Sequence, residues 1–227
     1  MIKWTTLITL LLIVLTSCGD RKTEKSTQSK AATSEPVVKS SKKKILFFGN
    51  SITAGYQLDL EDAFPAVIQK RLDSLGYEYE VINAGLSGET TASGASRIEW
   101  VLQTIPDIFV LELGANDGLR GLPLEQSQKN LQIIIDEVKR VNPMVEIIIC
   151  GMEVPPNLGE QYTGAFRTIF PKVAEKNHAV LIPFLLEGVA GETELNLGDG
   201  IHPTSEGHAI VAETVWKYLA PLLTKHS

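Results

Sequence analysis

The sequence predicts a three-layer α/β fold in which a five-stranded parallel sheet carries helices on both faces. From residue 45 onward, apolar runs of strand length alternate with segments of helical period. The runs are continuously apolar, which is typical of strands that are covered on both faces. Repeated strand–helix units of this kind build parallel sheets with right-handed crossovers. We see neither an internal repeat nor a second domain in this region.

The first half of the domain contains two strand–helix units. Residues 45–48 form an apolar run that ends at Gly49, and a helix is expected over 63–75, where apolar residues recur three and four apart until Gly76. A second strand is expected over 80–83, and a second helix over 92–105.

The second half continues the same alternation. The segment 124–141 is an amphipathic helix by its pattern, because apolar residues occur at 131, 134, 135 and 138. The other expected elements are strands over 107–113, 145–150 and 180–182 and helices over 163–177 and 205–223.

Polar residues follow the first three expected strands. Ser51 comes after the first strand, residues 85–88 come after the second, and residues 114–117 come after the third. Sites in open parallel sheets form beyond the carboxyl ends of the strands, so we expect these residues to meet at one edge.

Four residues have the chemistry that acyl transfer needs. An ester hydrolase uses a hydroxyl nucleophile, a base, a carboxylate that orients the base, and fixed donors for the oxyanion. Ser51, His202 and Asp199 supply the first three, and the Asn116 amide is a donor. Because Asp199 lies three residues before His202, one loop can supply both the base and its carboxylate.

Each of these residues also has a structural interpretation. Ser51 could be a helix N-cap, His202 a surface histidine, and Asp199 and Asn116 turn residues. His208 is a competing base, although its position in the first turns of the closing helix favours packing or capping.

Four blocks of the chain together resemble the SGNH, or GDSL-type, hydrolases, in the right order over residues 45 to about 220. The blocks are Gly49–Tyr56, Asn83–Thr91, Gly114–Gly118 and Asp199–Pro203. Two further segments, Leu111–Gly121 and Met152–Gly159, are similar to the bacterial thioesterase/lysophospholipase/arylesterase subgroup. Asn50 stands where the family usually has Asp. Asn accepts most of the same local backbone hydrogen bonds.

The resemblance implies a flavodoxin-like SGNH fold and a role for particular residues. The catalytic residues would be Ser51, Asp199 and His202, and the oxyanion hole would combine the Ser51 and Gly88 N–H groups with the Asn116 side chain. Gly88 could instead serve only to reach a positive φ. The loop that lines the acyl site would contain Pro155, Pro156 and Asn157.

The expected function is a serine esterase that hydrolyses acyl esters or thioesters, such as lysophospholipids or aryl esters, without a cofactor. One alternative is a carbohydrate O-deacetylase on the same fold. Another is a noncatalytic lipoprotein of the cell envelope that binds lipid or glycan. No metal site is expected, because the four histidines and two cysteines show no ligand spacing.

The N-terminal region predicts a lipid anchor. Residues 1–17 read as a signal peptide with a short apolar run, and Leu15–Cys18 resembles the lipobox of a bacterial lipoprotein. An ordinary secretory signal with a chance Cys18 is the alternative. Lipidated Cys18 and the Lys- and Ser-rich segment up to residue 44 would tether the domain 45–227 to a membrane of the bacterial envelope.

Charge and cysteine content exclude other classes. Subtracting Lys3 and the tether from the whole chain leaves 12 basic and 24 acidic residues in 45–227, which argues against nucleic acid as a partner. The basic tether could contact anionic headgroups, although a solvated linker is the simpler interpretation. Cys150 is expected to be a buried strand residue, and with Cys18 lipidated no intramolecular disulfide is available.

Overall fold

A single sheet of five parallel strands forms the centre of the structure, a computed structural model that describes residues 42–225. The strand order is β2-β1-β3-β4-β5. The strands are β1 (Lys43–Gly49), β2 (Tyr79–Gly85), β3 (Ile108–Glu112), β4 (Glu146–Cys150) and β5 (Val180–Ile182). The predicted α/β class and the five strands are confirmed. The predicted signal peptide, Cys18 and the tether up to residue 41 lie outside the described residues.

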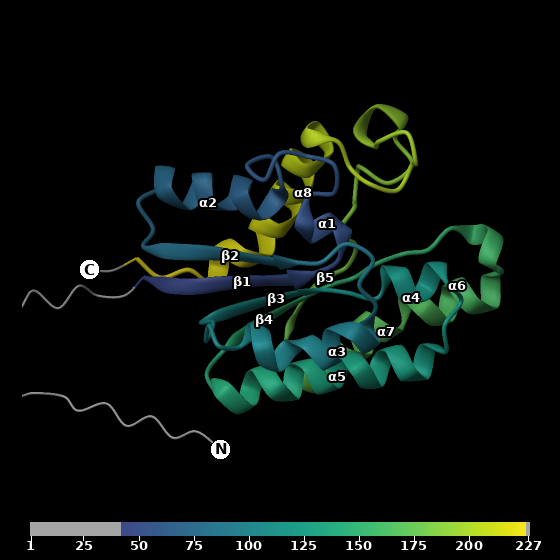
Figure 1. The fold of residues 1–227 in the computed structure, drawn as a ribbon, viewed down its shortest axis with the longest axis horizontal. Coiled ribbons are helices and arrows are strands. Elements are labelled where there is room, and N and C mark those ends of the chain that lie inside the picture. Colours follow the sequence, from purple (N-terminus) through teal and green to yellow (C-terminus); the bar gives the residue numbers. More distant parts are fainter. Residues whose placement is uncertain (1–41, 226–227) are drawn as a thin grey trace, which may run out of the picture. The chain divides into compact units, whose positions relative to one another are not determined.

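Helices cover both faces of this sheet (Figure 1). α2 (Phe64–Ser74) and α8 (Ser205–Leu219) pack together on one face, and α3 (Thr91–Val101), α5 (Leu124–Val141) and α7 (Ile169–Asn177) cover the other. The chain passes from β1 through α2 to β2, and returns across β1 through α3 to β3. The strand order therefore reverses at β1, and sites in such sheets form beyond the carboxyl ends of the strands at this reversal.

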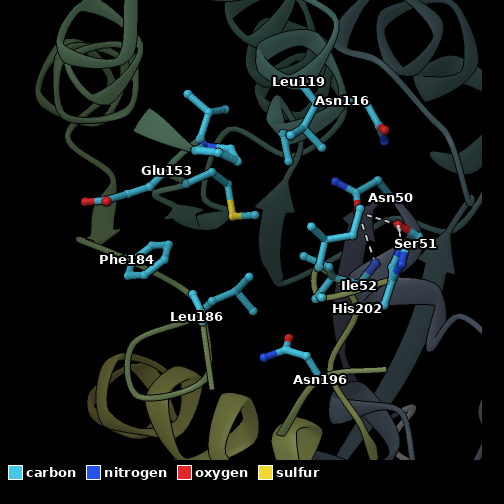
Figure 2. A pocket seen from close by; sticks show the side chains of 18 of the residues that line it. Asn50, Ser51, Ile52, Asn116, Leu119, Glu153, Phe184, Leu186, Asn196 and His202 are labelled. Carbon is cyan, nitrogen blue, oxygen red and sulfur yellow. Dashed lines mark hydrogen bonds between the residues drawn. The ribbon is translucent and has the colours of Figure 1, made fainter. Parts of the chain in front are cut away.

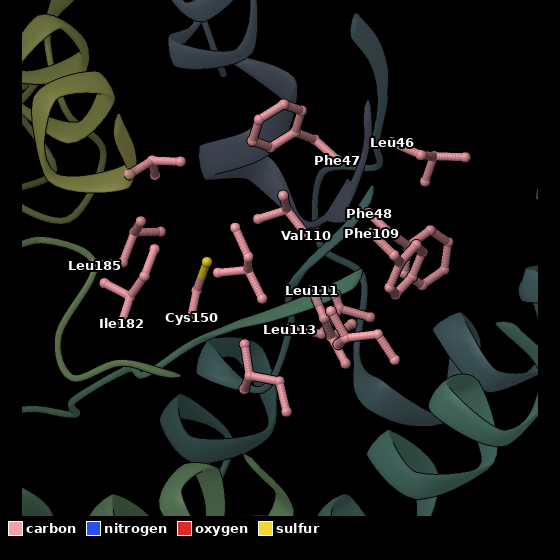
Figure 3. Close-up of a cluster of buried hydrophobic side chains, with 14 of the residues drawn as sticks. Leu46, Phe47, Phe48, Phe109, Val110, Leu111, Leu113, Cys150, Ile182 and Leu185 are labelled. Carbon is pink, nitrogen blue, oxygen red and sulfur yellow. The ribbon is translucent and has the colours of Figure 1, made fainter. Parts of the chain in front are cut away.

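The core lies on both sides of the sheet because successive side chains of a strand point to opposite faces. Phe47 of β1 meets Phe64 of α2 edge to face, with ring centroids 5.4 Å apart. Phe48, the next residue, stacks with Phe109 of β3 at 5.8 Å and carries the Arg97 guanidinium of α3 over its ring. Figure 3 shows Phe47, Phe48 and Phe109 among the buried side chains of β1, β3 and β4.

Two of the predicted helices are wrong in their extent, and a proline explains the division of the first. The helix predicted over 163–177 is two helices, α6 (Glu160–Arg167) and α7, which meet at Thr168. Pro171 has no N–H for the Arg167 carbonyl, so α6 cannot continue through it, whereas a proline is tolerated in the first turn of α7. The helix predicted over 92–105 already ends at Val101, with Leu102 as its C-cap, whereas Pro106 disfavours helical backbone only at Ile105.

The closing helix is also shorter than predicted. α8 ends at Leu219 and continues as a 3-10 turn, Ala220–Leu222, that contains Pro221. No helix within residues 42–225 has both the length and the apolar character that a membrane crossing requires.

Two short helices that the sequence did not predict begin directly after strands. α1 (Ser51–Ala54) follows β1, and α4 (Ala115–Leu119) follows β3. Each is too short for a hydrophobic period to be recognised, because it spans little more than one turn. Both lie at the carboxyl edge of the sheet and carry candidate site residues.

Candidate active site

Ser51 is the first residue of α1 at the carboxyl end of β1. Asn50, not Ser51, caps this helix, because its Oδ1 accepts a hydrogen bond from the Ile52 N–H at 3.0 Å. Gly55 ends the turn in the left-handed conformation at φ 71°, which glycine adopts without strain. The predicted N-cap alternative for Ser51 is therefore wrong, and its hydroxyl is left to other partners.

Ser51, His202 and Asp199 are hydrogen-bonded in series. The His202 Nε2 atom lies 2.8 Å from Ser51 Oγ, and His202 Nδ1 lies 2.7 Å from Asp199 Oδ2. A carboxylate can only accept, so Nδ1 donates to Asp199 and the neutral ring presents Nε2 as an acceptor for the Ser51 hydroxyl. Figure 2 shows the Ser51 and His202 side chains facing one another.

The loop before α8 holds Asp199 by its own backbone. Asp199 Oδ1 accepts the Ile201 and His202 N–H groups at 3.0 and 3.1 Å, and Gly200, between Asp199 and Ile201, is at φ 73°. The pKa of Asp199 is lowered, first by the Ile201 N–H and then by the His202 ring. On its other side, the His202 ring contacts Tyr56, with centroids 4.5 Å apart.

Asn116 and Gly88 lie in two adjoining segments at the same edge. The Asn116 amide of α4 donates to the Glu89 carbonyl at 3.0 Å and so ties α4 to the loop after β2. In that loop Gly88 is at φ 81°, and its carbonyl accepts from Arg120 at 3.1 Å. The buried Glu89 carboxylate pairs with Arg97 through two contacts, which anchors the loop to α3.

A cavity of about 500 Å³ adjoins Ser51 and His202. Of the residues predicted for the substrate loop, Pro155 and Pro156 line the cavity and Asn157 does not. Asn116 also lines it, and Gly88 does not. Figure 2 places Ser51 and His202 on one side of the cavity and Phe184 and Glu153 on the opposite side. The apolar lining comes from separate segments of the chain: Ile52, Leu119, Met152, Val154, Phe184, Leu186 and Ile201.

Sequence reasoning missed most of this lining because each residue looks like an ordinary core residue. Phe184 and Leu186 follow β5, and Leu119 ends α4, so no local pattern connects them. Glu112 at the end of β3 was also missed as a site residue. Its carboxyl group is bonded to Asn50 and Thr53, on either side of Ser51.

His208 has a structural role, as the packing interpretation predicted. It is 1% exposed in α8, and its Nδ1 accepts the Phe64 N–H at the start of α2 at 3.1 Å. Burial lowers the pKa of His208 to about 4. The predicted burial of Cys150 is confirmed, and burial raises the pKa of its thiol.

The described part of the chain contains no group of three or more histidine, cysteine or acidic side chains placed to hold a metal ion. The candidate site thus consists of a hydroxyl, an imidazole, a carboxylate and amide groups beside an apolar cavity. On a parallel α/β sheet, these features define the class of hydrolytic enzymes that act on acyl compounds.

Comparison with known proteins then gives the family. Residues 47–210 match the GDSL-like Lipase/Acylhydrolase family. The chain belongs to this family, and it is a carboxylic ester hydrolase.

Three relatives carry related names. Esterase TesA of Pseudomonas aeruginosa is 39% identical over 180 residues, which cover 79% of this chain and 89% of that protein. An arylesterase of Vibrio mimicus is 38% identical over 184 residues, covering 81% and 89%. Thioesterase 1/protease 1/lysophospholipase L1 of Escherichia coli is 34% identical over 184 residues, covering 81% and 86%.

A solved structure agrees with these relatives. The crystal structure of TesA superposes with a TM-score of 0.76 at 38% identity. The match covers 80% of this chain and 100% of the TesA chain. The predicted resemblance to the SGNH family is confirmed, and so is the predicted fold.

Proposed function

We propose that the protein is a serine esterase in which Ser51, His202 and Asp199 act as a catalytic triad on acyl esters or thioesters. The observation that carries this proposal is the series of hydrogen bonds from Ser51 Oγ to Asp199, which begins beside an apolar cavity.

Acylation starts when Ser51 Oγ attacks the acyl carbon. His202 Nε2 takes the hydroxyl proton as the new C–O bond forms, and Asp199 stabilises the resulting imidazolium through Nδ1. Collapse of the tetrahedral intermediate breaks the bond to the leaving alcohol or thiol, which receives the proton from Nε2. Water then attacks the acyl-enzyme in the same way and releases the acid.

The oxyanion would be held by three donors: the N–H groups of Ser51 and Gly88 and the Asn116 amide. The φ of 81° at Gly88 and the anchoring of its loop by Arg120, Asn116 and Glu89 support a fixed backbone there. The Asn116 amide has two hydrogens, so one remains for the oxyanion while the other bonds the Glu89 carbonyl.

The cavity favours acyl chains over small acyl groups. Its volume of about 500 Å³ and its mainly aliphatic and aromatic lining offer far more apolar contact than an acetyl group could use. Relatives named lysophospholipase, thioesterase and arylesterase support the same substrate range. We therefore rank acyl esters such as lysophospholipids above acetylated carbohydrates.

A p-nitrophenyl ester series from acetate to palmitate tests the proposal, with wild type and Ser51→Ala measured side by side. We expect hydrolysis that prefers longer chains and disappears in Ser51→Ala. Equal rates for the two proteins would contradict the serine mechanism, and a maximum at acetate would favour the deacetylase.

We also propose, from the N-terminal sequence, that Cys18 is lipidated and that the enzyme works at a membrane of the bacterial envelope. This placement favours substrates that occur in the envelope, such as lysophospholipids, over cytoplasmic thioesters.

A further inference from the structure

A buried carboxyl group is bonded to residues on either side of the proposed nucleophile. Glu112, the last residue of β3, is 1% exposed, and Gly49 is its neighbour on β1. A Cβ atom at Gly49 would lie 2.5 Å from Glu112 Oε2 and 2.1 Å from Thr53 Oγ1. Only glycine at this position leaves room for the carboxyl group.

Four donors from the Ser51 turn converge on this carboxyl group. Its Oε1 accepts the Asn50 Nδ2 group at 2.7 Å. Its Oε2 accepts the Asn50 N–H at 3.0 Å, the Thr53 N–H at 3.3 Å and the Thr53 hydroxyl at 2.8 Å. Glu112 thus holds the residue before Ser51 and a residue after it.

Asn50 connects the Glu112 carboxyl group to the proposed nucleophile, Ser51. While its Nδ2 is bound to Glu112, its Oδ1 faces the other way, caps the Ile52 N–H and lies 3.4 Å from Ser51 Oγ. If the Asn50 amide turned over, its bonds to the Glu112 carboxylate and to the Ile52 N–H would be lost together, because the flip places two acceptors opposite one another at Glu112 and two donors opposite one another at Ile52.

The environment makes these donors necessary. Burial raises the pKa of Glu112 to about 7, and the bonds from Thr53 and Asn50 act in the opposite direction. A buried carboxylate is stable only where donors surround it. The charged form of Glu112 therefore needs the donors of the Ser51 turn, and the turn is held by bonds to that carboxylate.

We infer that Glu112 is a positioning residue for Ser51, acting through Asn50. Its carboxylate fixes the orientation of the Asn50 amide and the first turn of α1, and so fixes the direction of the Ser51 hydroxyl toward His202. This inference rests on the proposed role of Ser51 as the nucleophile.

The bond between Glu112 and Asn50 can be tested by exchanging the carboxylate and the amide between the two positions. Glu112→Gln keeps the shape of the side chain but places an NH₂ group opposite either Asn50 Nδ2 or the donors at Oε2. Asn50→Asp alone places two carboxyl groups at the 2.7 Å contact. In the double variant, the new amide at position 112 can donate to the new carboxylate at position 50, while the amide oxygen accepts the other three donors. The second oxygen of that carboxylate still caps the Ile52 N–H.

The experiment measures kcat and KM for a p-nitrophenyl ester with the full chain carrying Glu112→Gln, Asn50→Asp or both. We expect Glu112→Gln to lower kcat about tenfold or more with little change in KM. We expect the double variant to recover most of this loss. Glu146→Gln, an exposed glutamate at the start of neighbouring β4, is the matched control and should leave kcat unchanged.

Two results would overturn the inference. One is a wild-type kcat in folded Glu112→Gln. The other is a double variant whose kcat is no higher than that of Glu112→Gln. A purely structural role predicts changed unfolding midpoints without this recovery of kcat. If Glu112→Gln does not fold, Thr53→Val removes one donor with nearly the same shape and should also lower kcat.

Reaction of Ser51 with an alkyl fluorophosphonate separates this inference from the proposed function. Labelling needs no acyl chain, so a wild type that labels at Ser51 but hydrolyses no ester contradicts only the substrate class. In that case the labelling rates of the same variants decide the role of Glu112. A wild type that does neither overturns both.

Discussion

At the scale of single residues, the site depends on which atoms carry protons. Asp199 is held by backbone N–H groups on one oxygen and by the His202 ring on the other, so its carboxylate sets the tautomer of the imidazole. The Ile201 N–H and the His202 ring lower the Asp199 pKa, because both donate to the ionised carboxylate.

We expect Asp199→Asn to lower kcat about a thousandfold, because an amide NH₂ opposite Nδ1 favours the tautomer that cannot accept from Ser51. Steady-state kinetics on a p-nitrophenyl ester would measure this, with KM nearly unchanged. Asp136→Asn, an exposed aspartate of α5, is the control. A loss of less than about threefold would remove Asp199 from the triad.

Asn116 offers a second test at this scale. Asn116→Ala should lower kcat about a hundredfold or more with little effect on KM, since an oxyanion donor acts mainly in the transition state. Gln103→Ala removes an exposed amide in the turn that leads into β3 and should change neither constant. An Asn116→Ala effect confined to KM would indicate a binding role instead.

At the scale of elements, α1 is placed by close packing against the end of β2. A Cβ atom at Gly85 would lie 2.3 Å from the Ala54 backbone nitrogen and 2.7 Å from the Thr53 carbonyl carbon. The Asn83 side chain of β2 also donates to the Thr53 carbonyl at 2.8 Å. The backbone of β2 therefore fixes where α1, and with it Ser51, can lie.

Gly85→Ala should consequently lower both stability and kcat, because only a shift of the α1 backbone could relieve the contact. We expect a loss of about 1–3 kcal/mol in the free energy of unfolding, measured with urea. Gly164→Ala in α6 is the matched control, since a Cβ atom there meets nothing within 4 Å. An active, stable Gly85→Ala protein would show that α1 adapts freely.

The contact between α2 and α8 predicts a pH dependence of stability. The folded pKa of His208, about 4, lies below its ordinary value of 6.5. Between these values the unfolded chain binds a proton that the folded chain does not, so stability falls as the pH drops from about 6.5 to about 4.

Urea unfolding of wild type and His208→Gln at several pH values would isolate this effect. We expect the wild type to lose up to about 3 kcal/mol more than the variant over that range. The raised pKa of Glu112 gives the opposite slope, but it is common to both proteins and cancels in the difference. Parallel curves would show that folding does not lower the pKa of His208.

At the scale of the whole molecule, the chain enters the domain at the edge opposite the site. β1 begins at Lys43 and runs toward Ser51, so a tether before residue 42 would be attached where the amino ends of the strands lie. The proposed anchoring at Cys18 and the hydrolysis of esters should therefore be separable by mutation.

Cys18→Ala tests this separation in the full-length protein. We expect the wild type in the membrane fraction, with label from radioactive palmitate, and the variant unlabelled and released from it. The kcat for a soluble ester should be the same for both. Labelling of the variant would contradict lipidation at Cys18.

Much of the fold could be predicted because it follows from local periodicity. The continuous apolar runs predict strands buried on both faces, and the helix over 124–141 was predicted with the bounds that α5 has. Predictions failed where a single proline outweighs the period, as at Pro171, or where an element spans about one turn, as in α1 and α4.

By itself, the sequence determined the order of the five strands and of the longer helices between them, the family, and the residue types of the candidate site: Ser51, Asn116, Asp199 and His202. Only the tertiary structure decided which groups surround them. It showed that Asn50 is the cap, that Glu112 bonds residues on both sides of Ser51, and that apolar residues from separate segments share one cavity. The physical reason is that a local pattern fixes which face of a strand or helix is buried, whereas contacts between distant segments depend on how those faces pack.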